Sequence, residues 1–438
     1  MQIYSTLLCS ATCLALASSS AIAGTATFRG DTTHSGVYAD AGVPTLHGVK
    51  WSFATKGQVM SSPAIADGTA FVGSTDGRLY AVDIANGAQR WVFQTGARVT
   101  SSPAVVDGVV YFASYDGSFY AVGAKDGQLK WKFTTGGERR FAAKHLHGSL
   151  PVTETMPDPF DLYLSSPAIV NGVVYFGSGD GNVYALDAAS GAARWKYQTG
   201  DVVHASPAVT DGVVYIGSWD SYFYALDAAS GAVKWRFKTG EDPVIHNQVG
   251  IQSSAAVVDG VVYFGCRDSK LYAVDARSGR QLWAFDNKGS WVIASPAVRD
   301  GRVYFSTSDS GLLQMVDAKT GGSVAKLEFK RWAMFSSPAL AGDTLYIGSD
   351  SGKVFAVDLT SQKVRWTFET EASRRNGPGL TNADGTPNYA AAFKGNFYDE
   401  MVVGKQTMMS VGAVLSSPVV ADGVIYFGST DGNLYAVS

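Results

Sequence analysis

The sequence predicts an all-β protein: an eight-bladed β-propeller built from four-stranded antiparallel blades. The first observation is a repeat, typified by residues 165–200, SSPAIVNGVVYFGSGDGNVYALDAASGAARWKYQTG, which recurs eight times. The second is that each copy divides into four short β-branched and aromatic runs separated by turn residues. The third is a period of about 40 residues, which is typical of one propeller blade. The copies begin at Ser61, Ser101, Ser165, Ala205, Ser253, Ala294, Ser336 and Ser416.

The four expected strands of the copy at Ser165 are SSPAIV, VVYFGS, NVYALD and ARWKYQT. Asn171-Gly172 separates the first two, Asp-Gly takes its place in most other copies, and Asp180-Gly181 forms the second turn. These dipeptides favour type I′ hairpins, in which both central residues have positive φ. A single sheet of this kind cannot bury both of its faces, so we expect the copies to stack into one domain over residues 24–438.

Proline and tryptophan recur at fixed positions of the repeat. A proline inside the first strand is tolerated at a sheet edge, which places this strand innermost, facing the central channel. The prolines are Pro63, Pro103, Pro167, Pro207, Pro296, Pro338 and Pro418. The tryptophan four residues after the glycine is expected to dock on the next blade and to donate its N–H to a carbonyl. These tryptophans are Trp91, Trp131, Trp195, Trp235 and Trp283, whereas the sixth copy has Ala325, which predicts a weaker junction.

The two chain ends are expected to meet in one blade. Residues 50–55, KWSFAT, match the fourth strand of the repeat, and the eighth copy stops at Ser438 after three strands. We therefore predict that the N-terminal strand completes the last blade and closes the ring, which removes two exposed sheet edges.

Three insertions interrupt the regular spacing, at residues 136–164, 240–252 and 369–415. Each joins the fourth strand of one blade to the first strand of the next. Because strands alternate in direction, all three are expected on one face of the disk, and function is expected there. The longest carries Arg374-Arg375 and several aromatic residues, and we interpret it as a lid, a binding element or a dimer contact.

The N-terminus and the composition bear on location and partners. Residues 1–23 have the apolar stretch and the Ala21-Ile22-Ala23 site of a secretory signal peptide, which predicts a periplasmic or secreted protein, soluble after cleavage near Ala23. Cys13 is a poor match to a lipid-attachment site.

A net charge of −3 argues against nucleic-acid partners, and no later apolar run predicts a transmembrane segment. Cys266, the one cysteine outside the signal, is expected to be a small buried residue.

Most aspartates on the expected working face have an ordinary explanation. An aspartate recurs at the turn between the second and third strands of nearly every copy, which indicates that its carboxylate accepts hydrogen bonds from the backbone of its own loop. They are Asp76, Asp116, Asp180, Asp220, Asp268, Asp309 and Asp431, and the seventh copy has Asp350 one place early.

Departures from the repeat are better candidates for a ligand site. A mouth lined by Trp, Arg, His and Gln could stack a planar ligand and hold anionic groups, or these residues could instead seat the long loops. The candidates are Trp219, Asp220, Tyr222, His246, Gln248, Gln252, Arg267, Asp268, Trp291, Arg331 and Trp332.

Histidines supply a second candidate, a metal site. His145 and His147 form an HxH pair that, if extended, would point both rings the same way, with His204 or His246 as a third ligand. The alternative is that these rings bond loop carbonyls. No G-x-S-x-G, P-loop, H-E-x-x-H or G-x-G-x-x-G with a following helix is present, so hydrolase and nucleotide-binding functions have no sequence support.

The recurrent SSPAVVDGVVYFGS, followed by D-G-x-L-Y-A-L-D-A-x-x-G-x-x-x-W-x-F-x-T-G, resembles the PQQ-like β-propeller repeat over about residues 49–438. That family includes eight-bladed quinoprotein dehydrogenases and non-catalytic propellers, among them the lipoprotein scaffold of the outer-membrane β-barrel assembly machinery. The resemblance implies PQQ and Ca²⁺ in the first case and a protein partner in the second. The adjacent cysteine pair of enzymes related to methanol dehydrogenase is absent, as is a CxxCH haem motif.

These observations favour an exported, non-catalytic propeller that binds a protein partner or small ligand on its insertion-bearing face. A PQQ-dependent oxidoreductase with its cofactor at the channel mouth is the alternative, and a metal-dependent activity at the histidines is a third hypothesis.

Overall fold

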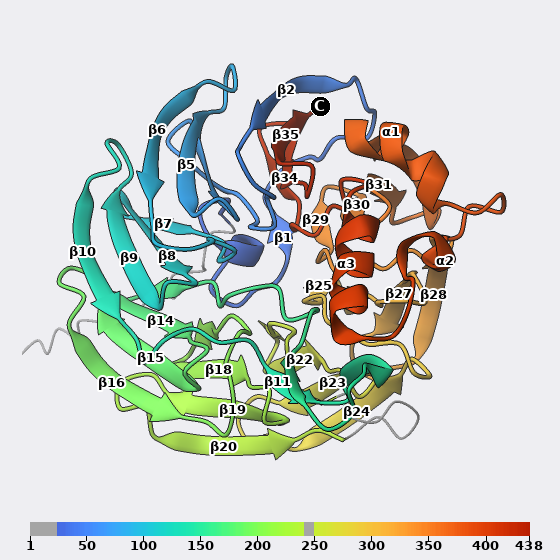
Figure 1. Ribbon diagram of the computed structural model, residues 1–438. Helices are drawn as coiled ribbons and strands as arrows, with labels where there is room; N and C mark the ends of the chain where they lie inside the picture. The colour runs from blue at the N-terminus through green and yellow to red at the C-terminus, as the bar shows by residue number, and fades with distance from the viewer. Residues whose placement is uncertain (1–23, 241–248) are drawn as a thin grey trace, which may run out of the picture.

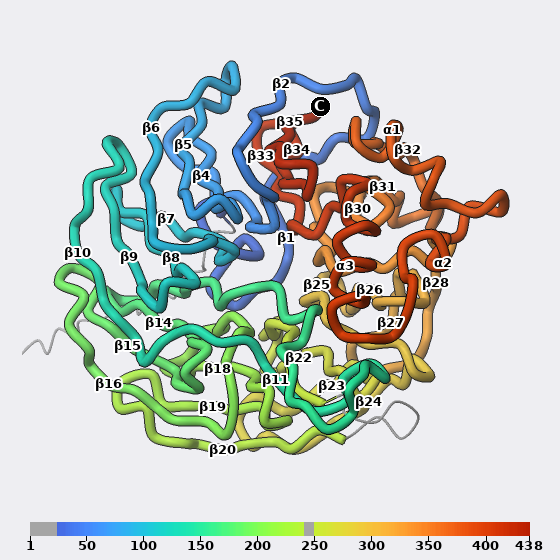
Figure 2. The backbone as a smooth tube through the Cα atoms, viewed as in Figure 1, coloured from blue at the N-terminus to red at the C-terminus, as the bar shows by residue number. Residues whose placement is uncertain are grey.

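The computed structural model describes residues 24–240 and 249–438, so the expected signal peptide lies outside the described residues. Eight blades, each of four antiparallel strands, surround a central axis, as Figure 1 and Figure 2 show, and one blade sheet gains a fifth strand from the N-terminal segment. The predicted eight-bladed propeller is confirmed. The first turn of the repeat also has the predicted geometry, since φ is 52° at Asn171 and 73° at Gly172. No helix in the two described ranges has the length and apolar character needed to cross a bilayer.

The first four blades follow the chain in order. Blade 1 comprises β3 (Ala64–Ala66), β4 (Thr69–Ser74), β5 (Arg78–Asp83) and β6 (Gln89–Gln94). Blade 2 comprises β7 (Ala104–Val106), β8 (Val109–Ser114), β9 (Ser118–Gly123) and β10 (Leu129–Thr134). Blade 3 comprises β13 (Ala168–Val170), β14 (Val173–Gly177), β15 (Asn182–Asp187) and β16 (Ala193–Gln198). Blade 4 comprises β17 (Ala208–Thr210), β18 (Val213–Gly217), β19 (Tyr222–Asp227) and β20 (Val233–Lys238).

The last four blades complete the circle. Blade 5 comprises β21 (Ala256–Val258), β22 (Val261–Gly265), β23 (Lys270–Asp275) and β24 (Gln281–Asp286). Blade 6 comprises β25 (Ala297–Arg299), β26 (Arg302–Ser306), β27 (Leu312–Asp317) and β28 (Ser323–Glu328). Blade 7 comprises β29 (Ala339–Ala341), β30 (Thr344–Ser349), β31 (Lys353–Asp358) and β32 (Lys363–Glu369). Blade 8 comprises β33 (Val419–Ala421), β34 (Val424–Gly428), β35 (Asn433–Val437) and β2 (Val49–Ala54).

Blade 8 closes the ring as predicted. The N-terminal strand β2 pairs antiparallel with β35, with Trp51 opposite Ala436 and Ala54 opposite Asn433. The last strand of the chain, β35, therefore lies inside a sheet whose outer strand β2 comes from the opposite end of the chain, and the pairing covers the edge that β35 would otherwise expose.

The tryptophans fix each blade to the next one. Trp91 of blade 1 donates its indole N–H to the Ala124 carbonyl of blade 2 at 2.9 Å. Its ring also lies against Gly127, where an added Cβ would come within 2.7 Å of the indole. The glycine of the repeat is thus needed to admit the neighbouring tryptophan, and the predicted docking is confirmed. In blade 7, Trp366 donates instead to the Val43 carbonyl of the N-terminal segment.

The N-terminal segment, residues 24–38, has a role that the sequence did not predict. It runs across the innermost strands in the centre of the ring (Figure 1), through η1 (Phe28–Gly30) and β1 (Val37–Tyr38), the latter parallel to β29. Its carbonyls accept the inner-strand N–H groups of six blades: Ile65 to Thr25, Val105 to Ala26, Val209 to Thr32, Val257 to Thr33, Val298 to Ser35 and Leu340 to Gly36, at 2.7–2.9 Å. The segment therefore satisfies backbone donors that would otherwise be buried without partners.

Two insertions fold together over one end of the channel. Residues 136–164 contain β11 (Ala142–Lys144), η2 (Leu146–Gly148) and β12 (Thr155–Pro157). Residues 369–415 contain α1 (Glu371–Leu380), α2 (Tyr389–Ala392) and α3 (Tyr398–Met409). The Leu150 N–H donates to the Asn396 carbonyl at 2.8 Å, and the Tyr398 N–H donates to the Leu150 carbonyl at 3.0 Å. We call these two insertions the cap. Of the insertion at 240–252, only residues 249–252 and Gly240 are described.

Trp51 tests the ring closure. It is 8% exposed and donates its indole N–H to the Ile84 carbonyl of blade 1 at 2.8 Å, which links the closing strand to the next blade. We expect Trp51→Ala to lower the free energy of unfolding by about 3–5 kcal/mol, because a large buried side chain is removed at the closure. Urea unfolding measures this loss. Val49→Ala on the same strand is the control and should change stability by less than about 0.5 kcal/mol; equal effects of the two variants would contradict the role of Trp51.

Candidate functional site

A cavity of about 570 Å³ lies between the cap and blades 5 to 7. Blade loops supply Trp291, Trp332 and Phe335, and the cap supplies Tyr389 of α2 and Met408 of α3. The walls are therefore mostly aromatic and apolar, and the volume falls in the range of small-molecule sites.

Trp332 anchors the cap above this cavity. Its indole N–H donates to the Gly385 carbonyl at 3.0 Å. Its ring is buried with Leu380, Met408 and Val411 of the long insertion. Trp332, one of the predicted ligand residues, thus lines the cavity and seats the loop at the same time.

Two carboxylates reach the cavity, Asp309 and Asp350. One oxygen of Asp350 is buried and has no hydrogen-bond partner among the described residues. Burial raises the pKa of Asp350, although the Lys405 ammonium opposes this shift. An unpaired carboxylate in an apolar wall is costly for a folded protein and is a common feature of functional sites.

Comparison with the repeat shows that these two aspartates lack a contact that the other blades have. In the other six blades the turn aspartate accepts the hydroxyl hydrogen of a tyrosine four residues later: Asp76 with Tyr80, Asp116 with Tyr120, Asp180 with Tyr184, Asp220 with Tyr224, Asp268 with Tyr272 and Asp431 with Tyr435. In blades 6 and 7 the tyrosine is replaced by Gln314 and Phe355, which occupy the same place in the strand pairing.

The expectation that Asp309 bonds the backbone of its own loop is therefore wrong. One extra residue in the blade 6 turn moves it, and its carboxylate accepts from the hydroxyls of Ser290 at 3.0 Å and Ser308 at 2.8 Å. Asp350, one place early in its turn, makes no side-chain bond of the repeat type. The missing tyrosines and the shifted aspartates were visible in the sequence, and together they would have identified this site.

A buried ionic cluster lies beside the cavity. The Arg267 guanidinium is sandwiched between the rings of Trp219 and Trp291, 4.3 and 4.5 Å from their centroids. It donates to Asp158 and, at 3.0 Å, to the Gln252 side-chain oxygen. Although burial raises the pKa of Asp158, the Arg267 charge and the bond with His147 hold that pKa well below its usual value. The predicted Trp, Arg and Gln residues thus come together, and they hold the insertion 136–164 through Asp158.

The remaining ligand candidates lie in different surroundings. Asp220 and Asp268 accept the N–H groups of Gly200 at 2.7 Å and Gly240 at 3.0 Å, in addition to their tyrosines. Tyr222 lies beneath the charged groups of Arg236 and Lys238 on the outer strand of blade 4. Arg331 is exposed in a loop. His246 and Gln248 lie outside the described residues.

The histidines of the proposed metal site are not gathered. His145 and His147 both have positive φ, 55° and 57°, in and beside a 3-10 turn, so the segment is not extended and the condition for a paired orientation does not hold. His145 is exposed, and His147 lies 3.2 Å from Asp158. Among residues 24–240 and 249–438 no three His, Cys, Asp or Glu side chains are placed to hold a metal ion. Cys266 is buried, as predicted, and burial raises its pKa far above the usual value.

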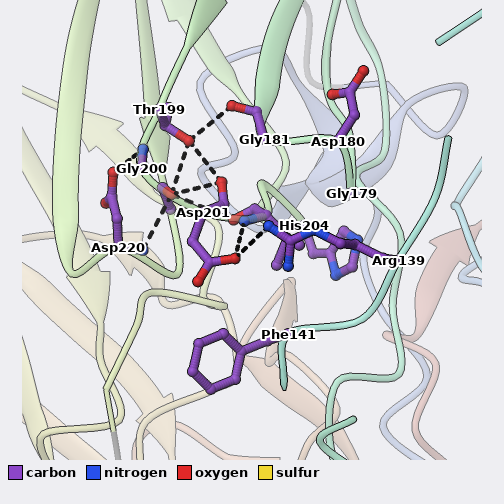
Figure 3. A network of polar contacts seen from close by, with 12 residues as sticks. Arg139, Phe141, Gly179, Asp180, Gly181, Thr199, Gly200, Asp201, His204 and Asp220 are labelled. Carbon is purple, nitrogen blue, oxygen red and sulfur yellow. Dashed lines mark hydrogen bonds and ion pairs between the residues drawn. The ribbon is translucent and has the colours of Figure 1, made fainter. Parts of the chain in front are cut away.

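His204 holds the start of the cap to blades 3 and 4. Its Nδ1 lies 2.7 Å from Asp161 and its Nε2 lies 3.4 Å from Glu138, both in the insertion 136–164. Figure 3 shows the surrounding contacts, including the ion pair of Arg139 with Asp201 at 2.8 Å. Although burial lowers it, the two neighbouring carboxylates raise the pKa of His204 to about 10, so the ring is a buried cation at neutral pH.

PQQ is a planar tricarboxylate that needs an open aromatic face and several cations, and Ca²⁺ needs several oxygen ligands. The facing indoles of Trp219 and Trp291 are both covered by Arg267, and the charge of Arg267 is neutralised by Asp158. The described carboxylates form no group of the kind that a cation requires. These residues do not fit PQQ with Ca²⁺, and we derive no oxidation step from them.

Comparison with known proteins identifies the family. The family model described as outer membrane protein assembly factor BamB matches residues 47–158, 153–368 and 289–438. The chain belongs to this family. No curated protein matches the sequence of this BamB-family chain.

Solved structures with the same fold include both functional groups of the repeat. BamB from Moraxella catarrhalis is 18% identical, with 89% of this chain and 97% of that chain covered and a TM-score of 0.63. A europium-containing methanol dehydrogenase is 13% identical, with 96% and 98% covered and a TM-score of 0.68. The quinohemoprotein alcohol dehydrogenase from Comamonas testosteroni is 13% identical, with 96% and 81% covered and a TM-score of 0.68. At these identities the similarity establishes the propeller fold alone.

His204 makes the attachment of the cap sensitive to pH. Because the pKa of His204 is raised from 6.5 to about 10 on folding, its contribution to stability is complete below pH 6.5 and is lost as the pH rises through 10. We expect His204→Gln to be less stable at neutral pH and to lack this decline. Urea unfolding of both proteins across this pH range checks the expectation. His145→Gln should retain the wild-type profile, and parallel profiles for wild type and His204→Gln would contradict the assignment.

Proposed function

We propose that this protein is an exported, non-catalytic propeller that binds a protein partner through its cap, as part of outer-membrane protein assembly. The family membership supports the process, because the matching family is described as an outer-membrane assembly factor. Residues 1–23 support export, since their composition and the Ala21-Ile22-Ala23 site are those of a signal peptide.

The observation that carries the partner-binding proposal is an exposed apolar surface on the cap. Val152, Phe397 and Val403 are 46%, 56% and 57% exposed, and they come from both insertions. We call these three residues the cap patch. Leu150 and Phe397 form an isolated parallel bridge, so the first two members lie where the insertions meet. Apolar groups that stay exposed in the described part of the chain, grouped on a segment outside the repeat, are typical of protein-binding surfaces.

Other exposed apolar residues do not have this meaning. The outer strands of six blades each expose one apolar residue, so exposure at these strands is a general feature of the blades. These residues are Val92, Leu129, Val233, Leu282, Val324 and Val364. The cap patch belongs instead to two insertions that are not part of the repeat. This contrast supports a specific partner on the cap rather than general surface hydrophobicity.

The quinoprotein alternative rests on fold similarity alone. The residues around Arg267 do not fit the cofactor, as described above. The non-catalytic proposal is therefore the better supported of the two.

Site-specific photo-crosslinking tests the partner surface. With a photoreactive phenylalanine at position 397, expressed in the native host, we expect a covalent adduct with one envelope protein, identified by mass spectrometry. The same partner should be captured from position 403. Leu129, 50% exposed on the outer strand of blade 2, is the matched control and should give no such adduct. Identical adducts from positions 397 and 129, or none from position 397, would contradict the proposal.

A further inference from the structure

We propose that the cavity beneath the cap is a second binding site, specific for a small organic cation such as an apolar amine, with Asp350 as its counter-ion and the surrounding aromatic rings as its walls. This inference goes beyond the partner surface, because the cap patch lies on the outside of the cap whereas Asp350 and the aromatic rings line the cavity.

The first argument comes from the repeat itself. Six blades use the turn aspartate to accept a tyrosine hydroxyl, and the two blades that lack this bond are the two whose aspartates line the cavity. Asp350 has lost its tyrosine to Phe355, and one of its oxygens is buried without a partner. A carboxylate kept in this state lacks a structural explanation, whereas a ligand that donates hydrogen bonds would satisfy it.

The second argument is the chemistry of the walls. Trp291, Trp332, Phe335, Tyr389 and Phe393 line the cavity, together with Phe160. Aromatic faces attract cations through their quadrupoles, most strongly where water is excluded. The protein already uses this interaction at the edge of the site, because the Lys405 ammonium lies 4.0 Å from the centroid of Phe160.

The third argument is the balance of charge. Asp309 and Asp350 are the two carboxylates of the lining, and Lys405 is its one lysine or arginine. The Lys405 ammonium donates to the Pro159 carbonyl. Lys405 and Asp350 attract each other electrostatically, but no direct ion pair joins them in the described part of the chain. Arg267 lies outside the lining and is already paired with Asp158. The lining therefore holds two carboxylates against one lysine, and this excess of negative groups favours a cationic ligand over a carboxylate ligand.

Three probes of similar shape and different charge test this site: phenethylamine, phenethyl alcohol and phenylacetate. We expect saturable binding of the amine at one site, detected by calorimetry and by a change in the fluorescence of Trp291 and Trp332. The alcohol and the acid should bind at least about tenfold more weakly, since each lacks the charge-assisted bond to Asp350.

Asp350→Asn removes the charge and keeps the size of the side chain. We expect it to weaken binding of the amine by about tenfold or more and to leave binding of the alcohol nearly unchanged. Glu154→Gln, an exposed carboxylate of the cap outside the cavity, is the matched control and should bind the amine as wild type does. Cooperative urea unfolding of Asp350→Asn confirms that the variant is folded.

Two results would overturn the site: equal binding of the three probes, or unchanged amine binding by Asp350→Asn. Absence of saturable amine binding at millimolar concentration would do the same. The crosslinks from position 397 distinguish this failure from that of the proposed function, because they report the outside of the cap and should persist in Asp350→Asn.

Discussion

A closed circle of hydrogen bonds around the channel holds the eight blades in register. The second serine of each repeat donates its backbone N–H to the hydroxyl oxygen of the corresponding serine in the next blade, at 2.8–3.2 Å. The serines are Ser62, Ser102, Ser166, Ser206, Ser254, Ser295, Ser337 and Ser417. The circle ends where it begins, since Ser417 donates to Ser62 at 2.9 Å. A ring with one blade fewer would have to break or reshape these bonds, so the constraint favours a single blade number.

The same constraint accounts for the two chain ends. The serine circle closes the propeller at its centre, and β2 beside β35 completes the last blade at the rim. The inner strands still present N–H groups toward the channel, and the segment 24–38 accepts six of them. Arg29 completes the centre by donating to the carbonyls of Pro296 and Pro338. The first residues of the described chain therefore connect blades that are distant in sequence, and the last strand depends on the first.

Much of this architecture could be predicted because repetition supplies its own evidence. The turns at Asn171-Gly172, the docking of Trp91 and the closure by residues 50–55 each follow from a local rule applied to a repeated pattern. The path of residues 24–38 could not be predicted in this way, because it occurs once and depends on backbone groups rather than on side-chain pattern. The extended backbone on which the paired orientation of His145 and His147 depended is absent for a related reason. Left-handed backbone at His145 and His147 is set by the contacts of a single loop, and no period in the sequence encodes it.

The repeat also allows the contacts of an unusual residue to be compared with those of its equivalents in the other blades. A residue that appears in every copy and makes the same bond in every copy is explained by the fold, as Asp116 is by Tyr120. Trp219 and Arg267 depart from the pattern, but both have partners within the protein. The Arg267 guanidinium stacks on Trp219 and forms an ion pair with Asp158. Asp350 also departs from the pattern, but no group in the described chain donates a hydrogen bond to its buried carboxylate oxygen. A departure from the repeat that has no partner inside the protein is the stronger sign of an external ligand, because a ligand that donates a hydrogen bond would offset the free-energy cost of the unpaired Asp350 oxygen.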